Sequence, residues 1–271
     1  MIMKFMMLIL PFLFAWNVSN ANNKDLKIKL ASLDYIPYYG KEMRNHGPVS
    51  EIIIEAFKEK GYQAKNISID FLPWNRALAA SKNGAYHGLF AVWFNQERTQ
   101  WFHFSDKLPP NEVGFYINAE EQDKLKGKSL SGLKGYRIGW VRGYSVPDIF
   151  KKEIGEDQLI ITEDDVTLMR LLVAKRISLA MSDKQVGIHA TNHQSIEKLK
   201  KRNNFKMKWL KTIESKDQHL AFPKNLAKSI TSVPNNVRDS QKLLNDFNSG
   251  LKIIKEKGLI KKIYDSHGLS L

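Results

Sequence analysis

Arg98 and Asp183 are the two residues whose charges and surroundings most strongly indicate a binding site. Each follows the same local pattern, in which an amphipathic helix is followed by a short polar break and an apolar strand that ends near the charge. A guanidinium in one copy and a carboxylate in the other are complementary to the two charges of a zwitterion. We therefore predict an amino-acid-like ligand held between two halves of the protein, and binding rather than catalysis.

The elements that must position these two charges can be placed on the sequence by their periodicity. In the first copy, a helix is expected at 74–80 and a strand at 88–93. In the second copy, a helix is expected at 165–174 and a strand at 177–181. Asp183 would then follow the carboxyl end of a buried strand, which is where open α/β sheets bind their ligands.

The first 21 residues have the composition of an export signal. Lys4 is the only charge before Lys24, and Phe5–Trp16 is an apolar run too short to span a bilayer as a helix. Ser19-Asn20-Ala21 then places small residues at the −3 and −1 positions of a cleavage site. We expect cleavage after Ala21 and a periplasmic mature protein, with an N-terminal membrane anchor as the alternative.

The length, the cysteine count and the net charge of the sequence exclude some classes of function. Removing 21 of the 271 residues leaves enough chain for one large or two ordinary domains. The sequence has no cysteine, which excludes thiolate metal sites and thiol nucleophiles. Its net charge of +14 is concentrated in runs such as Lys198–Arg202 and Lys252–Lys262. Nucleic acid is the obvious alternative partner. The export signal and the lack of a recognised nucleic-acid motif argue against it, so we expect a solvated basic face instead.

The order of the expected elements indicates an α/β protein. A strand at 27–33 is followed by an aromatic loop and by a helix that begins at Pro48. Strands that alternate with helices in this way imply a parallel sheet. Two polar gaps, at 107–112 and 213–218, interrupt this alternation, and the basic stretch 198–208 is expected to be irregular.

Four short motifs follow one another along the chain: Glu97-Arg98 with Phe104-Ser105-Asp106, then Leu133–Gly139, Gly143-Tyr144-Ser145 and Gly258–Tyr264. In this order they resemble the bacterial extracellular solute-binding proteins of family 3, the periplasmic amino-acid-binding proteins of ABC importers. The resemblance covers about Lys27 to Gly268. It implies a type II periplasmic-binding-protein fold, with two α/β lobes joined by two crossover strands near the polar gaps. Lobe 1 would comprise 22–108 and 218–271, and lobe 2 would comprise 109–217.

The resemblance also implies roles for individual residues. Arg98 matches the arginine that clamps the ligand carboxylate, a task suited to the planar fork of a guanidinium. Asp183 matches the acid that receives the α-ammonium, and a helix N-cap is its alternative role. Tyr35 and Trp74 match the aromatic positions that sandwich the ligand side chain. Tyr38 is a further candidate at the rim.

The other candidate ligand-binding residues are expected along the same cleft. Gly143, Tyr144 and Ser145 would present backbone N–H groups and a hydroxyl at a helix N-terminus, or they form an ordinary strand-to-helix turn. The remaining candidates are Ala91 and Trp93 on the strand before Arg98, Arg142 as a second cation, and Arg76 one turn beyond Trp74. Arg142 and Arg76 are equally compatible with exposed positions.

Three residues depart from the family pattern. Trp93 replaces the usual threonine or serine, Asn95 replaces a threonine, and His87 replaces an aspartate at the start of the strand. A hydroxyl expected to contact the ligand is therefore missing, and an indole takes its place. A smaller ligand, a modified amino acid and a cation stacked on aromatic rings all remain compatible with this site.

The resemblance implies that hinge closure around the ligand presents it to a membrane ABC importer. A stand-alone sensor for a membrane receptor is one alternative. Another is a cyclohexadienyl-dehydratase-like enzyme, for which Glu51 or Asp183 would supply the acid or base. His189 and His193 are spaced to share a helix face, but the glutamate of a zinc-protease helix is absent. We expect a monomer with no cofactor and no metal.

Overall fold

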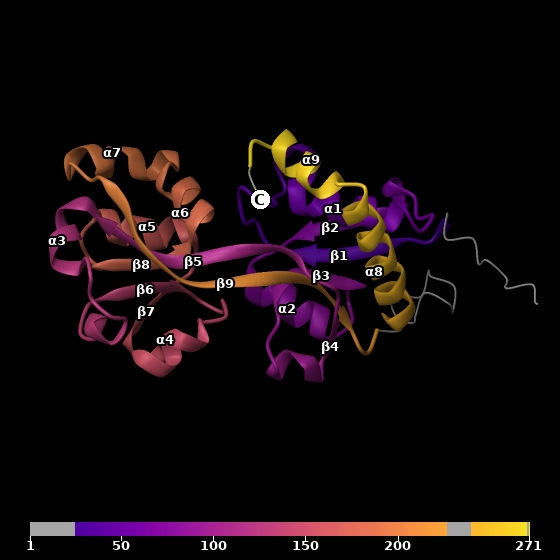
Figure 1. Ribbon diagram of the computed structural model, residues 1–271, viewed down its shortest axis with the longest axis horizontal. Coiled ribbons are helices and arrows are strands. Elements are labelled where there is room, and N and C mark those ends of the chain that lie inside the picture. The colour runs from indigo at the N-terminus through magenta and orange to yellow at the C-terminus, as the bar shows by residue number, and fades with distance from the viewer. Residues whose placement is uncertain (1–24, 227–239, 270) are drawn as a thin grey trace, which may run out of the picture.

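The computed structural model describes residues 25–226, 240–269 and 271, without the side chain of Ala91 (Figure 1). The predicted export signal lies outside the described residues, so it remains a prediction. Within the described ranges, no helix has the length and apolar character needed to cross a membrane.

One continuous mixed sheet runs through the described chain in the order β2-β1-β3-β9-β5-β8-β6-β7, and β4 pairs with β9. In the first lobe, β1 pairs in parallel with β2 and β3, and in the second lobe β6 pairs in parallel with β7 and β8. The pairs that include β5 or β9 are antiparallel. The strands are β1 (Ile28–Ser32), β2 (Ile67–Phe71), β3 (Gly88–Trp93), β4 (Phe102–Phe104), β5 (Leu108–Asn118), β6 (Ile138–Val141), β7 (Leu159–Thr162), β8 (Leu179–Asp183) and β9 (Met207–Pro223).

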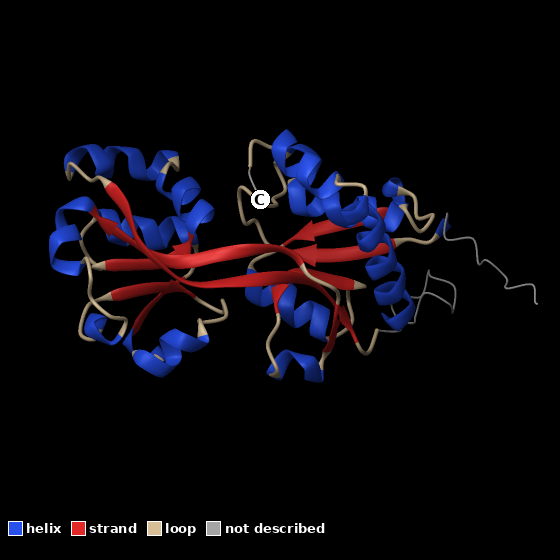
Figure 2. Ribbon diagram, viewed as in Figure 1, coloured by secondary structure: helices blue, strands red, loops and turns tan. Residues whose placement is uncertain are grey.

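Helices flank this sheet on both sides in each of two lobes (Figure 2). The first lobe has α1 (Pro48–Lys58), α2 (Trp74–Lys82), α8 (Ser240–Glu256) and α9 (Leu259–Ser266). The second has α3 (Gln122–Leu125), α4 (Asp148–Glu153), α5 (Asp165–Val173), α6 (Lys184–Thr191) and α7 (Gln194–Arg202). The α8 helix packs on α1, so the first lobe is built from both ends of the described chain (Figure 1). The fold is therefore the predicted two-lobe, type II architecture.

The strands β5 and β9 pass side by side from one lobe to the other (Figure 1). The polar segments 107–112 and 213–218 lie largely within these two strands, so they are parts of the crossover strands rather than breaks between elements. Asn111 and Gln218 within them are buried, whereas Pro110 and Ser215 are exposed. Leu108 pairs with Gln218, and the register shifts between Leu108 and Pro110. The two predicted lobe boundaries therefore face each other across the ladder, although their positions as hinges remain a prediction.

Two other expectations also differ from the structure. The basic stretch 198–208 is not wholly irregular, because α7 continues to Arg202. Its lysines are exposed on a helix that buries Ile196, so the segment is an amphipathic surface helix. The strand expected at 177–181 begins and ends two residues later, so Asp183 is the last residue of β8 rather than a residue beyond it.

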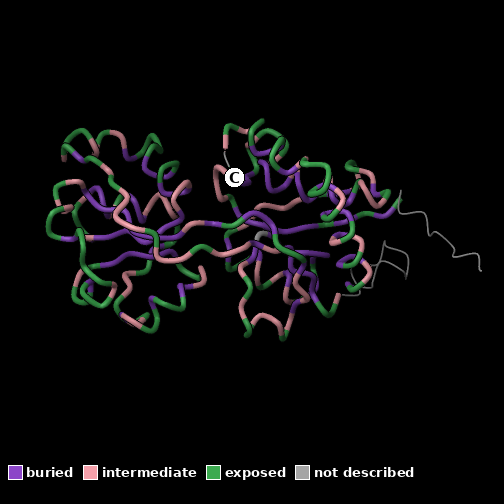
Figure 3. Tube along the Cα trace, in the orientation of Figure 1, coloured by how far each residue is buried: buried purple, intermediate pink, exposed green. Residues whose placement is uncertain are grey.

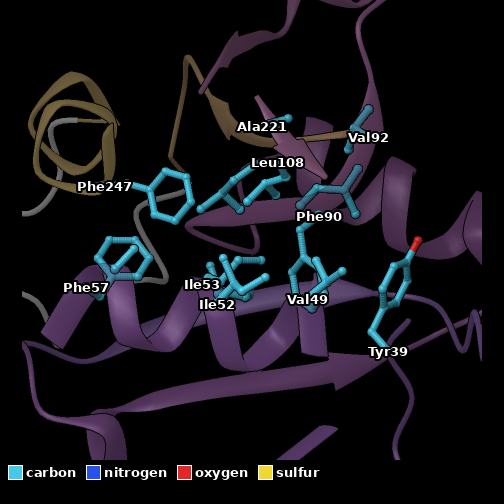
Figure 4. Close-up of a cluster of buried hydrophobic side chains, with 14 of the residues drawn as sticks. Tyr39, Val49, Ile52, Ile53, Phe57, Phe90, Val92, Leu108, Ala221 and Phe247 are labelled. Carbon is cyan, nitrogen blue, oxygen red and sulfur yellow. The ribbon is translucent and has the colours of Figure 1, made fainter. Parts of the chain in front are cut away.

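Apolar side chains form a separate core in each lobe, and buried chain concentrates along the strands (Figure 3). In the first lobe, Phe57 of α1 packs on Phe247 of α8, with ring centroids 5.3 Å apart (Figure 4). Tyr144 of the second lobe packs against the cores of both lobes. Val186 of α6 belongs to the first lobe's cluster. The lobes are therefore in apolar contact as well as covalently joined.

Gly250 allows the close approach of α8 to α1 and supplies a test of this packing. A Cβ at Gly250 would lie 1.9 Å from the carbonyl oxygen of Ala56. We expect Gly250→Ala to lower the free energy of unfolding by about 1–3 kcal/mol, because the helices must separate. Ser249→Ala, at the exposed neighbouring position, is the control and should change it by less than about 0.5 kcal/mol. Equal stability of the two variants in urea denaturation would contradict this packing.

Candidate functional site

A cavity of about 50 Å³ lies between the lobes. Aromatic rings dominate its walls, and Arg98 is its only charged lining residue within the described chain. The first lobe contributes Leu33, Tyr35, Tyr39, Trp74, Trp93 and Arg98, while Asn111, Trp140, Tyr144 and Ser145 come from β5 and the second lobe. The structure thus brings six of the candidate residues together around one cavity: Tyr35, Trp74, Trp93, Arg98, Tyr144 and Ser145.

A hydrogen bond across the cleft closes one side of this cavity. The Trp74 indole, at the first residue of α2, donates to the carbonyl oxygen of Gly143 over 2.8 Å. Gly143 has φ +78°, and a Cβ there would lie 2.0 Å from Oδ1 of Asn75. Glycine is therefore required both by the backbone conformation and by the approach of the opposite lobe. Tyr35 and Tyr144 add an edge-on ring contact between the lobes, with centroids 5.8 Å apart.

Arg98 lies in the 3-10 helix Glu97–Gln100 and is partly buried beneath the aromatic wall. Its Nη1 donates to the carbonyl oxygen of Trp93 over 3.4 Å, and its guanidinium carbon is 5.4 Å from the Trp74 ring centroid. Burial lowers the pKa of Arg98, but a guanidinium remains charged in proteins. Arg98 forms no ion pair within the described residues, so its charge is available to an anion.

Asp183 is buried at the end of β8 and the start of α6, and it does not line the cavity. Its Oδ1 accepts hydrogen bonds from the backbone N–H groups of Gln185 and Val186, at 2.9 and 3.1 Å. Its Oδ2 accepts from Nδ2 of Asn111 over 3.1 Å, and Tyr38 also bonds to the carboxylate. The alternative helix-cap role of Asp183 is therefore present. Burial nevertheless outweighs these bonds and raises the pKa of Asp183 to about 6.

Asp165 is a second carboxylate with a perturbed pKa, and the sequence pattern indicated it only as the first residue of the helix expected at 165–174. Its Oδ2 accepts a hydrogen bond from the hydroxyl of Tyr144 over 2.9 Å. Burial is the largest cause that raises the pKa of Asp165 to about 7, and the nearby charge of Asp183 adds to it. The cap itself is Asp164, whose side chain accepts from the N–H of Thr167. Like Asp183, Asp165 forms no ion pair with a described residue.

Some candidate residues lie away from the cavity. Arg142 is exposed and forms an ion pair with Glu163, its Nη2 lying 3.0 Å from Oε1. Arg76 is exposed and does not line this cavity. Ala91 lies in β3, but its side chain is outside the described part of the structure. These positions favour the exposed alternatives for both arginines.

The expected helix N-terminus at Gly143–Ser145 is wrong. The α4 helix begins at Asp148 after Pro147, which occupies the N-cap position. The carbonyl oxygen of Gly143 points toward Trp74 and accepts its hydrogen bond. The turn therefore does not present only backbone N–H donors to the cleft. The strand-to-helix turn, the alternative for this motif, describes its backbone better.

The positions of Glu51, His189 and His193 give little support to the enzyme and metal alternatives. Glu51 lies apart from the cavity, where its Oε2 is 3.0 Å from Nε2 of His267. His189 and His193 do not share a helix, because α6 ends at Thr191 and His193 caps α7. Within the ranges that the structure describes, no group of three or more histidine, aspartate or glutamate side chains is arranged to hold a metal ion.

Five residues of the site were not predicted from the sequence: Leu33, Tyr39, Asn111, Trp140 and Asp165. Asn111 joins the charges to the aromatic wall, since it donates to Asp183 and its Oδ1 accepts from Nε1 of Trp93 over 3.4 Å. It follows Pro109-Pro110 within the segment 107–112, which the sequence pattern indicated only as a polar gap. Trp140 precedes the recognised Gly143 turn by three residues, and its indole donates to the carbonyl oxygen of Tyr144.

Solved structures with the same fold include several proteins of low sequence identity. A histidine kinase sensor domain with similarity to periplasmic binding proteins is 16% identical, with TM-score 0.70, over 90% of this chain and 98% of that one. ArtJ, an arginine-, lysine- and histidine-binding protein from Geobacillus stearothermophilus, is 16% identical, with TM-score 0.68 and coverage of 90% and 96%. An ancestral arginine-binding protein bound to arginine is 18% identical, with TM-score 0.67 and coverage of 89% and 97%.

Curated proteins yield no match to this sequence. The family-level comparison does, and it spans nearly the whole described fold. The sequence model of the bacterial extracellular solute-binding proteins, family 3, matches residues 30–270. Together with the two-lobe fold and the cavity between the lobes, this match establishes that the chain belongs to the bacterial extracellular solute-binding proteins of family 3.

Proposed function

We propose that this protein captures an amino-acid-like ligand in the cleft between its lobes and delivers it to a membrane ABC importer. The observation that carries the proposal is the set of unpaired charges around the cavity. Arg98 lines the cavity without a counter-ion within the described residues. Asp183 and Asp165 do not line it, but they accept hydrogen bonds from the lining residues Asn111 and Tyr144, and neither has a cationic partner in the described part of the chain. A ligand that supplies both a carboxylate and an ammonium group would complete these pairs.

The charge balance favours a ligand with an additional positive group. One guanidinium and two carboxylates leave a net negative site once both acids are ionised. A basic amino acid carries one carboxylate and two cations, so it complements all three residues. The aromatic wall is suited to such a group, since ring faces attract cations. The arginine-binding proteins of the same fold support this class of ligand by analogy alone.

Closure of the two lobes is the proposed mechanism of capture. The cavity of about 50 Å³ is far smaller than the roughly 300–1,000 Å³ typical of ligand pockets, so the lobes must separate to admit a ligand. The β5–β9 ladder is the connection about which they would move, near the irregular pairing at Leu108. Ligand contacts made to both lobes at once would then stabilise the closed state.

The cellular setting is proposed from the family and the export signal. A periplasmic binding protein would take its ligand from the surrounding medium and meet a permease at the membrane. A receptor that reads the closed form would use the same ligand site, and the likeness to a sensor domain concerns the fold alone. Import and sensing therefore share the binding chemistry tested below.

Removal of Arg98 is the most direct test of the carboxylate contact. Isothermal titration with L-arginine, L-lysine, L-histidine and L-glutamine should identify a ligand for the native protein. Arg98→Ala should weaken its binding by about 1.5–3 kcal/mol, because a charge-assisted pair is lost. Arg98→Lys keeps the charge without the fork, so its loss should be smaller. Arg202→Ala, at the exposed end of α7, is the matched control. Binding unchanged by Arg98→Ala would contradict the assignment.

The pKa values of Asp183 and Asp165 predict how binding depends on pH. Their values of about 6 and about 7 mean that both acids are increasingly protonated as pH falls from 7 to 5. An ammonium group requires the ionised acids, so affinity for the ligand should fall by about tenfold or more over this interval. The charges of the amino acid's own carboxylate and ammonium change little in this range.

Asp183→Asn separates this effect from a general response to pH. The amide is neutral at every pH, so the variant should bind weakly and its affinity should depend less steeply on pH. Titration calorimetry of both proteins at pH 5, 6 and 7 provides the comparison. A native affinity that is constant or rises toward pH 5 would show that these carboxylates do not receive the ligand's cation.

A further inference from the structure

A second cavity of about 220 Å³ adjoins the first along the cleft. Arg98, Tyr144 and Ser145 line both cavities, so these side chains form the partition between them. The outer cavity is also bounded by both lobes, with Lys82, Asn95, Glu97 and Trp101 on one side and Val146, Lys151 and Glu156 on the other. Both cavities therefore reach Arg98, the inner one from one side and the outer one from the other.

The relative sizes of the cavities suggest that the outer one is part of the binding site. The inner cavity, about 50 Å³, is well below the lower end of the usual range for ligand pockets, roughly 300 Å³. The two cavities of about 50 and 220 Å³ together approach that lower end. The arrangement therefore suits a ligand longer than a single amino acid.

The charges of the outer cavity indicate which group such a ligand would place there. Lys151 is paired with Glu156, with Nζ and Oε1 2.8 Å apart. Lys82 instead rests on the ring of Trp101, its Nζ 3.2 Å from the centroid, and forms no ion pair within the described chain. With Arg98, it leaves two unpaired cations against the single carboxylate of Glu97. The cavity therefore favours a negatively charged group.

Arg98 also fixes the direction in which the ligand extends. Under the proposed function, the ligand's ammonium lies toward Asp183, and its carboxyl end faces Arg98. Because Arg98 is shared by both cavities, an extension into the outer cavity leaves from the carboxyl end. A peptide bond at that position would carry the next residue outward and place its terminal carboxylate between Arg98 and Lys82.

We propose, on the basis of the proposed function, that the ligand class includes short peptides with a free N-terminus. The N-terminal residue, preferably basic, occupies the inner cavity, and the C-terminal carboxylate lies against Lys82 on the Trp101 ring. Lys82 is then a determinant of ligand length, whereas Arg98 serves free amino acids and peptides alike.

Three matched probes test this inference: L-arginine, L-arginyl-L-alanine and L-arginyl-L-alanine amide. Titration calorimetry with the native protein should give the dipeptide acid an affinity about tenfold higher than its amide, because only the acid carries the terminal charge. Lys82→Ala should bring the acid to within about twofold of the amide and leave arginine binding unchanged. Lys65→Ala, an exposed lysine that lines neither cavity, is the control.

The outcomes separate this inference from the proposed function. If arginine binds but the dipeptide acid binds no more tightly than its amide, the extended site is wrong and amino-acid capture stands. If neither arginine nor a peptide binds, and the other amino acids also fail, the proposed function itself is wrong. The comparison of acid with amide uses only the native protein, so it decides the question even if Lys82→Ala is unstable.

Discussion

Asp183 carries a buried carboxylate at the junction of the two lobes, and the surrounding elements are arranged to hold it there. An isolated charge in such a position is strongly unfavourable. The start of α6 supplies two N–H groups, the crossover strand β5 supplies Asn111, and the first lobe supplies Tyr38. These donors reduce the cost without removing it, as the raised pKa of Asp183 indicates. The site thus keeps a negative charge that a cationic ligand group would neutralise.

The same arrangement connects binding to the relative positions of the lobes. Asn111 contacts both Asp183 and Trp93, and Trp74 bonds to Gly143 across the cleft. Each contact joins an element of one lobe to the other lobe or to the strand between them. Separation of the lobes would break the Trp74 bond and expose the aromatic wall to water. A ligand that bridges Arg98 and the buried acids would oppose that separation, which is the physical basis of the proposed closure.

The sequence predicted those parts of the fold whose patterns are local. The apolar strand Gly88–Trp93 was placed to the residue, and Pro48 does begin α1. Parts of the β5 and β9 strands were interpreted as polar gaps because polar residues such as Asn111 and Gln218 interrupt the apolar pattern, although both are buried in the folded chain. The end of α7 was missed because its many basic residues resemble an irregular polar stretch, although the helix has a narrow apolar face around Ile196.

The candidate site was predictable where a motif or a residue type determines its chemistry, as for Arg98 and Trp74. Asp165 could not be assigned in this way, because its pKa is raised by burial and by the charge of Asp183, which is distant in sequence, against the opposing hydrogen bond from Tyr144. Arg142 was overestimated for the related reason that its partner Glu163 is adjacent only in the folded chain. Contacts between residues that are distant in sequence are therefore the part of the site that local patterns could not supply.

The central claim is that the cleft recognises both charges of a zwitterion, and it is tested most directly by deleting those charges from the ligand. Titration calorimetry would compare the tightest-binding amino acid of the panel with its methyl ester and its Nα-acetyl derivative. The account predicts that each derivative binds at least about tenfold more weakly than the parent, because each leaves one protein charge unpaired. A derivative that lacks either charge and still binds as tightly as the parent would contradict it.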